Sequence, residues 1–307
     1  MNETSHLTPA APRGQSLREP ARARTSLFHS RRLGDAAGRI LATIVLLVCV
    51  AVILLPVFWM LSTSFKTRAE VLMFPPRWIP AQLQWQNYPT ALSFLPFGRF
   101  FLNTAFITGV VLVADVIVNS LLGYAFARLH APGREALFIL VISTMMIPYQ
   151  VLMVPQYILF HLLGWIDTFR PLTVPAWFGS AFLVFLMRQF YRAIPAELDD
   201  AARIDGCGYI GIWWRILLPL SKPALATAAI FSFTYNWNDF TAPLIYLNSP
   251  DKLTVAVGLA YFQHRYGATP WNLLMAASLV TVSPCIILFF VAQRYFIQGI
   301  VVTGVKG

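Results

Sequence analysis

Six long apolar segments constrain this chain more than any other feature, because each approaches the length needed to cross a lipid bilayer. A transmembrane helix takes about 20 predominantly apolar residues. The segments cover residues 40–61, 101–126, 136–156, 173–190, 224–246 and 273–292. Charged residues make up only 12% of the chain, against about 25% in soluble domains. The sequence therefore predicts an all-α, polytopic membrane protein with six transmembrane helices within residues 38–296.

The third and fourth segments have the least definite ends. The fourth is short, and Pro148 and Pro155 interrupt the third. Proline in a membrane helix is tolerated where neighbouring helices satisfy the backbone groups that it frees, so we expect the third helix to lie inside a bundle. Residues 1–37 are rich in Pro, Ala, Ser and Arg and are expected to be disordered. Residues 297–307 are expected to form a C-terminal tail.

Lysine and arginine are unevenly distributed between the two sides that six helices create. With the N-terminus inside, 16 of the 23 fall on the inner side. Cytoplasmic loops carry the excess of these residues in membrane proteins. We therefore expect both termini and the charged segment 194–223 in the cytoplasm. Most of the basic residues behind the net charge of +10 therefore lie on the inner side. This charge does not indicate nucleic-acid binding, because the sequence shows no basic folded face.

The segment 194–223 has the pattern of two short helices around a turn. Pro195 suits the first position of a helix, and an acidic first turn follows, where carboxylates complement the helix dipole. Gly206 is expected to end this helix. A second helix is predicted over residues 209–218, before Pro219 and Pro223. The acidic residues of the first turn are Glu197, Asp199 and Asp200.

Several short motifs in and around this segment carry a family resemblance. Asp200-Ala201-Ala202, Asp205-Gly206 and, after nine intervening residues, Ile216-x-Leu218-Pro219 resemble the EAA loop of the membrane subunits of bacterial ABC importers. Flanking motifs narrow the resemblance, over about residues 38–307, to carbohydrate-uptake permeases related to the maltose-system "G" subunit. These motifs are residues 185–190, Trp237-Asn238-Asp239-Phe240 and the ending 293–307. One departure is that Asp200 stands where the family usually has Glu.

The resemblance implies that the loop docks on a cytoplasmic ATPase and couples its closure to alternating access, although a solvated amphipathic loop is the alternative. It also implies three partners in the bacterial inner membrane system: a second homologous permease, an ATPase dimer and an extracytoplasmic solute-binding protein. The candidate coupling residues are Glu197, Asp200, Ala201, Ala202, Arg203, Asp205, Gly206, Ile216, Leu218 and Pro219.

The sequence lacks the motifs of nucleotide hydrolysis and metal binding. A phosphate-binding P-loop requires a Gly-Lys pair, and Phe65, Ser221, Asp251 and Val305 precede the four lysines. We therefore expect ATP and Mg²⁺ on partner ATPase subunits, with no cofactor on this chain. The three cysteines and five histidines show no metal-ligand spacing, and no disulfide is expected. An intramembrane enzyme would need paired catalytic groups, and Asp115 and Asp239 lack a recognised motif.

Polar residues within the apolar segments are candidates for a translocation path. Asp115 and Asn119 are four residues apart, and Asn236 and Asp239 three apart, so each pair is predicted to share a helix face. Such groups also join helices by hydrogen bonds. Both roles stay open for Asp115 and Asn119, whereas the structural role is favoured for the fifth segment, because residues 237–240 resemble a family pattern. A sugar site would need aromatic faces, which Tyr149, Tyr235 and Trp237 offer. The candidates are Tyr149, Gln150, Tyr235, Asn236, Trp237, Asn238, Asp239, Asp115 and Asn119.

These features together predict the permease subunit of an ATP-driven, binding-protein-dependent ABC importer for sugars or oligosaccharides. An importer of the same class for glycerol phosphate esters or another small solute remains the main alternative. An intramembrane enzyme or a lone channel is less favoured.

Overall fold

The computed structural model describes residues 24–262 and 269–304, with side chains over residues 38–262 and 269–293. The described residues form helices, turns and connecting segments without a β-strand. The chain divides into two compact units, residues 1–58 and residues 59–307. The predicted all-helical membrane fold is thereby confirmed.

The described part of the first unit belongs to α1 (Arg24–Ser64), which contains the predicted segment 40–61. This helix begins within residues 1–37, for which the sequence predicts disorder. Adding residues to an existing helix is much easier than nucleating a new one, so the apolar span supports a helical extension at its N-terminal end. Residues 1–23 lie outside the described part of the chain.

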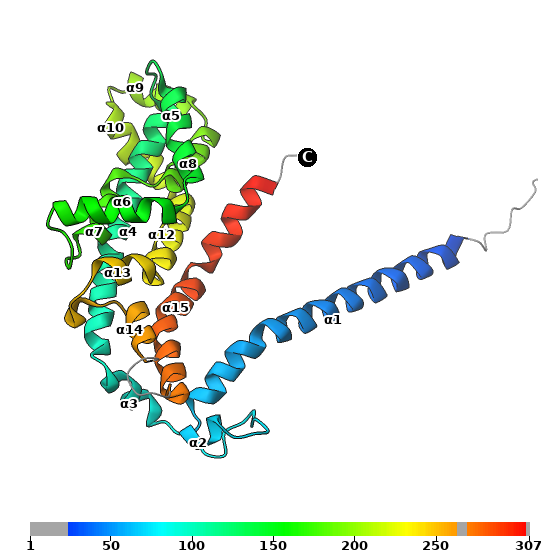
Figure 1. Cartoon of the computed structure of the whole chain (residues 1–307). Coiled ribbons are helices and arrows are strands. Elements are labelled where there is room, and N and C mark those ends of the chain that lie inside the picture. Colours follow the sequence, from blue (N-terminus) through cyan, green and yellow to red (C-terminus); the bar gives the residue numbers. More distant parts are fainter. Residues whose placement is uncertain (1–23, 263–268, 305–307) are drawn as a thin grey trace, which may run out of the picture. The chain divides into compact units, whose positions relative to one another are not determined.

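The second unit contains the remaining helices, shown in Figure 1. The first half has α2 (Arg68–Val71), α3 (Asn87–Phe94), α4 (Phe97–Arg128), α5 (Arg134–Ser143), η1 (Thr144–Met146), α6 (Tyr149–Leu162), α7 (Arg170–Thr173), η2 (Pro175–Phe178) and α8 (Ala181–Ala193). The second half has α9 (Glu197–Ile204), α10 (Tyr209–Ile212), η3 (Trp213–Leu217), α11 (Leu218–Leu220), α12 (Lys222–Trp237), α13 (Thr241–Tyr246), η4 (Pro250–Lys252), α14 (Val255–Tyr261) and α15 (Trp271–Gly304).

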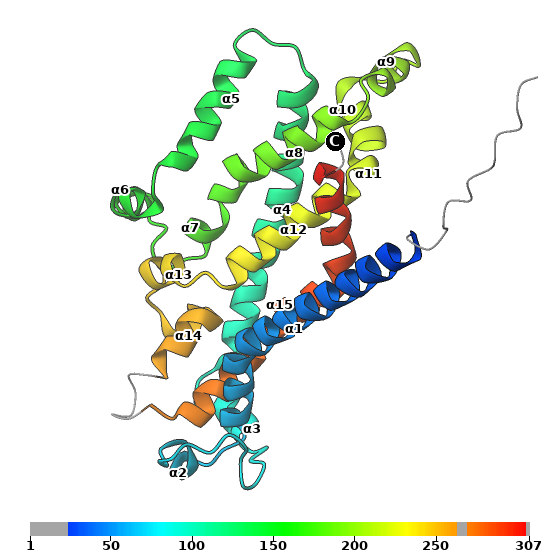
Figure 2. The same ribbon diagram turned by 90° about the vertical axis from the view of Figure 1, so that its right-hand side faces the viewer.

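Helix α4 is the element against which α8 and α12 pack. Figure 2 shows both helices crossing it obliquely. The approach of α8 is close because Gly123 has no side chain: a Cβ there would lie 2.5 Å from Cβ of Met187. α4 extends from the end of the unit that holds α3 to the end that holds α9 and α10 (Figure 1).

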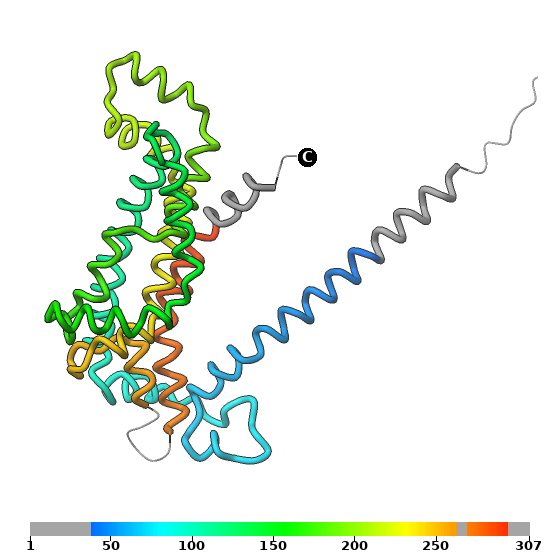
Figure 3. The backbone as a smooth tube through the Cα atoms, turned by 45° about the horizontal axis from the view of Figure 1, so that its top comes forward, coloured from blue at the N-terminus to red at the C-terminus, as the bar shows by residue number. Residues whose placement is uncertain are grey.

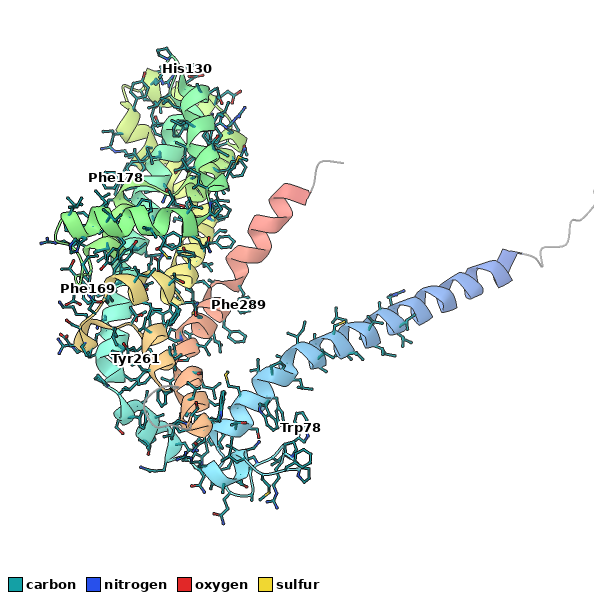
Figure 4. The ribbon with its side chains drawn as sticks, in the orientation of Figure 1. Trp78, His130, Phe169, Phe178, Tyr261 and Phe289 are labelled. Atoms are coloured by element: carbon teal, nitrogen blue, oxygen red, sulfur yellow. The ribbon has the colours of Figure 1, made fainter. Side chains whose placement is uncertain are left out.

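The two ends of the second unit carry different loops. His130, between α4 and α5, lies at the same end as α9, whereas Trp78, in the segment between α2 and α3, lies at the opposite end (Figure 4). The yellow-green tube in Figure 3 traces α9 to α11 at the first of these ends. The sequence places these two loops on opposite sides of the membrane, and the fold is consistent with that separation.

Within residues 24–262 and 269–304, four segments are long and apolar enough to cross a membrane as single units, and two further candidate spans are sharply bent. The four are Gly38–Ser64, Phe97–Arg128, Arg170–Ala193 and Trp271–Gln293. Counting each bent pair as one span gives up to six. The predicted number is therefore reached only with two broken helices, which apolar length alone does not reveal.

The third predicted segment is broken between η1 and α6, with a bend of 98° between its two halves. Pro148 lacks an N–H for the helix ladder, and the residue before a proline is driven out of the helical region. Ile147 accordingly has an extended conformation, with ψ 114°. The break makes Tyr149 and Gln150 the first residues of α6.

The second bent pair consists of Tyr209–Leu220 and Lys222–Trp237, with a bend of 82°, so the fifth span differs from the predicted segment 224–246. Its main helix, α12, has 16 residues, about 24 Å at 1.5 Å per residue, which is shorter than the ~30 Å hydrocarbon core. It ends at Trp237, and the chain resumes a helix only at Thr241. The polar residues between α12 and α13 therefore lie at a helix break.

Candidate functional site

The loop 194–223 forms the two-part helical structure that the sequence predicts, with different details. Helix α9 begins at Glu197 with Ala196 as its N-cap, so Pro195 precedes the cap and does not take the first helical position. The second part is interrupted: α10 gives way after Ile212 to a π-helical turn, η3, and then to α11. Three short elements replace the single predicted helix over residues 209–218.

The turn after α9 requires glycine at position 206 because of the backbone conformation there, and not because neighbouring atoms exclude a side chain. Gly206 has φ +79°, and no heavy atom lies within 4 Å of where a Cβ would stand. The N–H of Cys207 donates to the carbonyl of Ala202, and that of Gly206 to Arg203, which is the Schellman arrangement of a helix C-terminus. Within the chain, Gly206 thus sets the direction of the loop between its two parts.

The three acidic residues of α9 have different surroundings. Asp199 is 4% exposed, and its carboxylate forms an ion pair with Nε of Arg128 at 3.4 Å. Burial raises the pKa of Asp199, and Arg128 partly opposes that rise. Glu197 and Asp200 are exposed, with Asp200 3.5 Å from Arg203. Asp199 therefore faces the membrane domain, while Asp200 faces outward.

The loop also has a buried face and an exposed apolar face. On the buried face, Ala202 packs with three residues of the second part and four residues of the surrounding helices: Ile212, Trp213, Leu217, Tyr124, Met187, Tyr191 and Ala224. On the other face Ile204, Ile210 and Trp214 are 87%, 73% and 59% exposed. Large exposed apolar side chains outside a membrane are typical of protein interfaces, and Ile204 lies outside every candidate span in the described part of the chain.

The remaining candidate coupling residues divide between these two faces. Ala202 belongs to the buried face, and Ile216 and Leu218 are half-buried beside it. The exposed ones are Ala201, Arg203, Asp205, Gly206 and Pro219. The sequence motif therefore combines residues that hold the loop on the domain with residues that a partner could reach.

A second feature of the unit is a cavity of about 960 Å³, within the ~300–1,000 Å³ range of ligand pockets. It lies where the broken helices α6, α12 and α13 meet α4. Seven of the nine candidate path residues line it: Asp115, Tyr149, Gln150, Tyr235, Asn236, Asn238 and Asp239. Gln156, a weaker path candidate in the third predicted segment, joins them from α6. Phe160 of α6 and Thr254, just before α14, also line the cavity and were not among the candidates.

Asp115 and Asn119 act mainly as links between helices. Asp115 accepts hydrogen bonds from Ser232 of α12 at 2.7 Å and from the Asn119 side chain at 3.2 Å. Asn119 is fully buried and accepts the Ser180 N–H at 2.6 Å, outside the cavity. The pair shares a helix face as predicted, and that face joins α4 to α12 and to the start of α8.

Asn236 and Asp239 do not share a helix face, contrary to the sequence-based prediction. α12 ends at Trp237, and Asp239 instead accepts the N–H groups of Thr241 and Ala242 at 3.1 and 3.3 Å. An aspartate that satisfies the first N–H groups of a following helix competes with continuation of the preceding one. Both residues nevertheless reach the cavity.

Trp237 lies outside the cavity and has the contacts of a packing residue. It is 5% exposed, its Nε1 donates to the carbonyl of Thr281 at 2.9 Å, and its ring stacks on Phe233 with centroids 5.3 Å apart. These contacts attach α12 to α15 and agree with the structural alternative for this position.

An ionic cluster between α7 and α14 was not anticipated from the sequence. Asp167, at φ 59°, accepts hydrogen bonds from Ser249 and Asn248 and forms an ion pair with Lys252 at 3.0 Å. Hydrogen bonds from Ser249, more than the nearby Lys252, hold the pKa of Asp167 well below its usual range. The cluster ties the loop before α7 to the loop after α13.

Comparison with known proteins agrees with this architecture. The family model "Binding-protein-dependent transport system inner membrane component" matches residues 119–302. The arabinooligosaccharides transport system permease protein AraQ of Halalkalibacterium halodurans is 40% identical over 211 residues, covering 69% of this chain and 75% of that protein. The sn-glycerol-3-phosphate transport system permease protein UgpE of Yersinia pestis is 32% identical over 265 residues, covering 84% and 94%.

A solved structure has the same fold. It is described as a bacterial ABC transporter involved in the import of the acidic polysaccharide alginate, and it matches with a TM-score of 0.77 and 24% identity over 86% of this chain and 98% of that one. The resemblance drawn from the EAA loop is thus confirmed, and the chain is a multi-pass inner-membrane protein. It belongs to the family of binding-protein-dependent transport system inner membrane components.

Proposed function

We propose that this chain is a permease subunit of an ATP-driven importer for sugars or oligosaccharides. The relatives that carry the names of arabinooligosaccharide and sn-glycerol-3-phosphate permeases support this class of cargo. In this proposal the chain carries the solute and has no catalytic role of its own. ATP and Mg²⁺ bind separate ATPase subunits in this proposal, because the sequence has no phosphate-binding loop.

The observation that carries the proposal is the two-sided construction of α9. Asp199 and Ala202 hold its inner face against the membrane domain, while Asp200 and Ile204 leave an acidic and apolar face open. A carboxylate beside exposed apolar groups suits a partner groove that contains an arginine. A partner that moves this face would therefore move the domain behind it.

Movement of α9 would reach the cavity through α4. Arg128, at the C-terminal end of α4, donates to the carbonyl of Ile194 at 2.6 Å and pairs with Asp199. Further along the same helix, Thr104, Val111 and Asp115 line the cavity. A packed helix moves as a rigid body, so α4 would transmit a displacement of the loop to the cavity wall.

The complete transporter in this proposal contains further subunits. A second homologous permease forms the other half of the pore, an ATPase dimer binds the α9 loops of both permeases, and an extracytoplasmic solute-binding protein delivers the cargo. Both termini and α9 lie in the cytoplasm, as the lysine and arginine distribution indicates. The backbone of α15 continues to Gly304, into residues 297–307, for which the sequence predicts a C-terminal tail.

A matched pair of substitutions tests the docking role of α9. Ile204 is 87% exposed in the loop, and Ile79 is 74% exposed at the opposite end of the second unit. In cells that carry the complete transporter, Ile204→Ser is expected to reduce both oligosaccharide uptake and co-purification of the ATPase. Ile79→Ser is expected to leave the co-purification unchanged. Normal uptake and an intact complex with Ile204→Ser would refute the docking role.

A further inference from the structure

We propose that the cavity between α4, α6, α12 and α13 binds a neutral polyhydroxylated solute, and that Asp239 makes it unfavourable for anions. This inference rests on the proposed transport function and narrows its cargo. It predicts that neutral oligosaccharides bind in the cavity better than phosphate esters and acidic sugars, a distinction that the family relationship alone does not make.

Asp239 presents an unused acceptor to the cavity. Its Oδ1 accepts the N–H groups of Thr241 and Ala242, whereas its Oδ2 has no hydrogen bond to a residue in the described part of the chain. Asp115 differs, because both of its oxygens accept hydrogen bonds from this chain's own side chains. Asp239 is therefore the carboxylate that remains available to a bound solute.

Thr254 provides an independent indication that the cavity accepts a hydroxyl-bearing molecule. It is 3% exposed and lines the cavity, yet its hydroxyl has no hydrogen-bond partner among the described residues. A threonine at the N-cap of a helix normally accepts an N–H of that helix, but Thr254, the N-cap of α14, makes no such bond. A buried hydroxyl without a partner is costly, and a solute hydroxyl would satisfy it once the Thr254 side chain turns toward the cavity.

The charge of the lining opposes negative solutes. The cavity is lined by two carboxyl groups, those of Asp115 and Asp239, and by no Lys, Arg or His within the described residues. The nearby Lys252 is occupied elsewhere, because its Nζ donates to the backbone carbonyl and the carboxylate of Asp167. An anion would meet like charge without a compensating cation, and such like-charge contacts weaken binding.

The remaining polar and aromatic groups suit a sugar. Asn236 donates its amide to the carbonyl of Ser232 at 2.8 Å, so its oxygen is left to accept a solute hydroxyl. Tyr149, Tyr235 and Tyr246 add aromatic surfaces to the lining. Ligand pockets typically combine such apolar surfaces with a few directed polar groups. Acceptors predominate here, and hydroxyl groups of a neutral sugar would donate to them.

The experiment measures binding to the two permease subunits in lipid nanodiscs, without the solute-binding protein, by saturation-transfer NMR titration. The two probes are arabinotriose and its aldonic acid, which differ by one carboxylate. Wild type is expected to bind arabinotriose saturably and the aldonic acid at least about tenfold more weakly. Asp239→Asn is expected to remove most of this difference, whereas Asp251→Asn, an aspartate outside the cavity, is expected to preserve it.

A second pair of variants tests the hydroxyl contact and does not depend on Asp239. Thr254 and Thr108 are both buried with unpartnered hydroxyls, but only Thr254 lines the cavity. Thr254→Val is expected to weaken arabinotriose binding about fivefold to tenfold, and Thr108→Val to leave it unchanged. Assembly of each variant is checked by size-exclusion chromatography.

The outcomes separate this inference from the proposed function. Equal binding of the two probes, or no saturable binding of arabinotriose, would overturn the inference, as would equal effects of Thr254→Val and Thr108→Val. A different result would contradict the proposed function: intact cells that lack this chain would still take up neutral oligosaccharides at the normal rate.

Discussion

The carboxylate of Asp199 lies 3.4 Å from Nε of Arg128, and both side chains are largely buried where the loop 194–223 meets the membrane domain. Arg128 also donates to the carbonyl of Ile194, so one guanidinium holds both the start of the loop and its first helix. Neither residue belongs to the EAA motif as read from the sequence. Their pairing explains how the motif is attached to α4.

Loss of the Asp199 charge is expected to loosen this attachment. Asp199→Asn leaves the Arg128 guanidinium buried without its partner, a change that typically costs 3–5 kcal/mol in a fully buried pair. Burial disfavours the charged Asp199 carboxylate, which offsets part of this cost, so we expect a net loss of about 1–3 kcal/mol here, measured as a lower unfolding temperature in detergent, together with a lower ratio of transport to ATP hydrolysis. The matched control is Asp200→Asn, because the exposed pair with Arg203 is worth about 0–1 kcal/mol. Equal thermal stability of the two variants would contradict the anchoring role.

Substitution of Gly206 is expected to strain the turn without causing a clash inside the chain. At φ +79° an alanine costs roughly 1–2 kcal/mol, and asparagine less, because it enters this region more readily. We expect Gly206→Ala to lower the unfolding temperature and to impair coupling. Gly208→Ala is the control, since Gly208 has φ −75° and open space around it. Coupling that is unaffected by Gly206→Ala would show that the turn conformation is dispensable.

Two glycines of α4 test the packing of α8. A Cβ on Gly123 would lie 2.5 Å from Cβ of Met187 and 3.0 Å from the backbone nitrogen of Arg188, whereas a Cβ on Gly109 meets nothing within 4 Å. Gly123→Ala is therefore expected to destabilise the protein by about 1–3 kcal/mol through overpacking. Gly109→Ala should be neutral or slightly stabilising, since alanine favours the helix. Thermal unfolding in detergent measures both, and equal unfolding temperatures would argue against the close approach of α4 and α8.

The Asp167 cluster predicts a defined pH dependence. Because hydrogen bonds lower the pKa of Asp167 in the folded protein, the ionised carboxylate contributes stability that is fully present above its ordinary value of 3.8 and is lost as the pH falls below it. We expect Asp167→Asn to reduce stability by roughly 1–3 kcal/mol, by an amount that is constant from about pH 8 to pH 5 and narrows below about pH 4.

Unfolding in detergent at several pH values measures this difference. Asp251→Asn serves as the control, because Asp251 forms an exposed pair with Arg99, with side chains 50% and 60% exposed. A difference between wild type and Asp167→Asn that grows toward acidic pH would contradict the assignment.

The sequence predicted the elements that depend on local pattern. Apolar length located the spans, and the acidic first turn followed by Gly206 located α9, because helix dipoles and left-handed turns act within a few residues. Pro148 marked the third span as irregular. The sequence did not show that the chain bends by 98° there, since the direction of a break depends on packing against other helices.

The sequence did not show which residues from distant parts of the chain meet in space, because these contacts also depend on how the helices pack. Glu197, Asp199 and Asp200 look equivalent in a first helical turn, and only the position of Arg128 distinguishes Asp199. The cavity gathers Asp115, Tyr149 and Asp239 from three elements, and the helix break after Trp237 separated Asn236 from the face that it was expected to share with Asp239. Coupling and path roles for these residues remain predictions.

The most direct test of the central claim is the accessibility of position 204. Ile204→Cys, in a background with Cys49, Cys207 and Cys285 replaced by Ala, is labelled with a membrane-impermeant maleimide. The account predicts labelling in inside-out vesicles stripped of the ATPase, protection when the ATPase is added back, and no labelling in intact cells. Labelling from outside intact cells, or equal labelling with and without the ATPase, would contradict it.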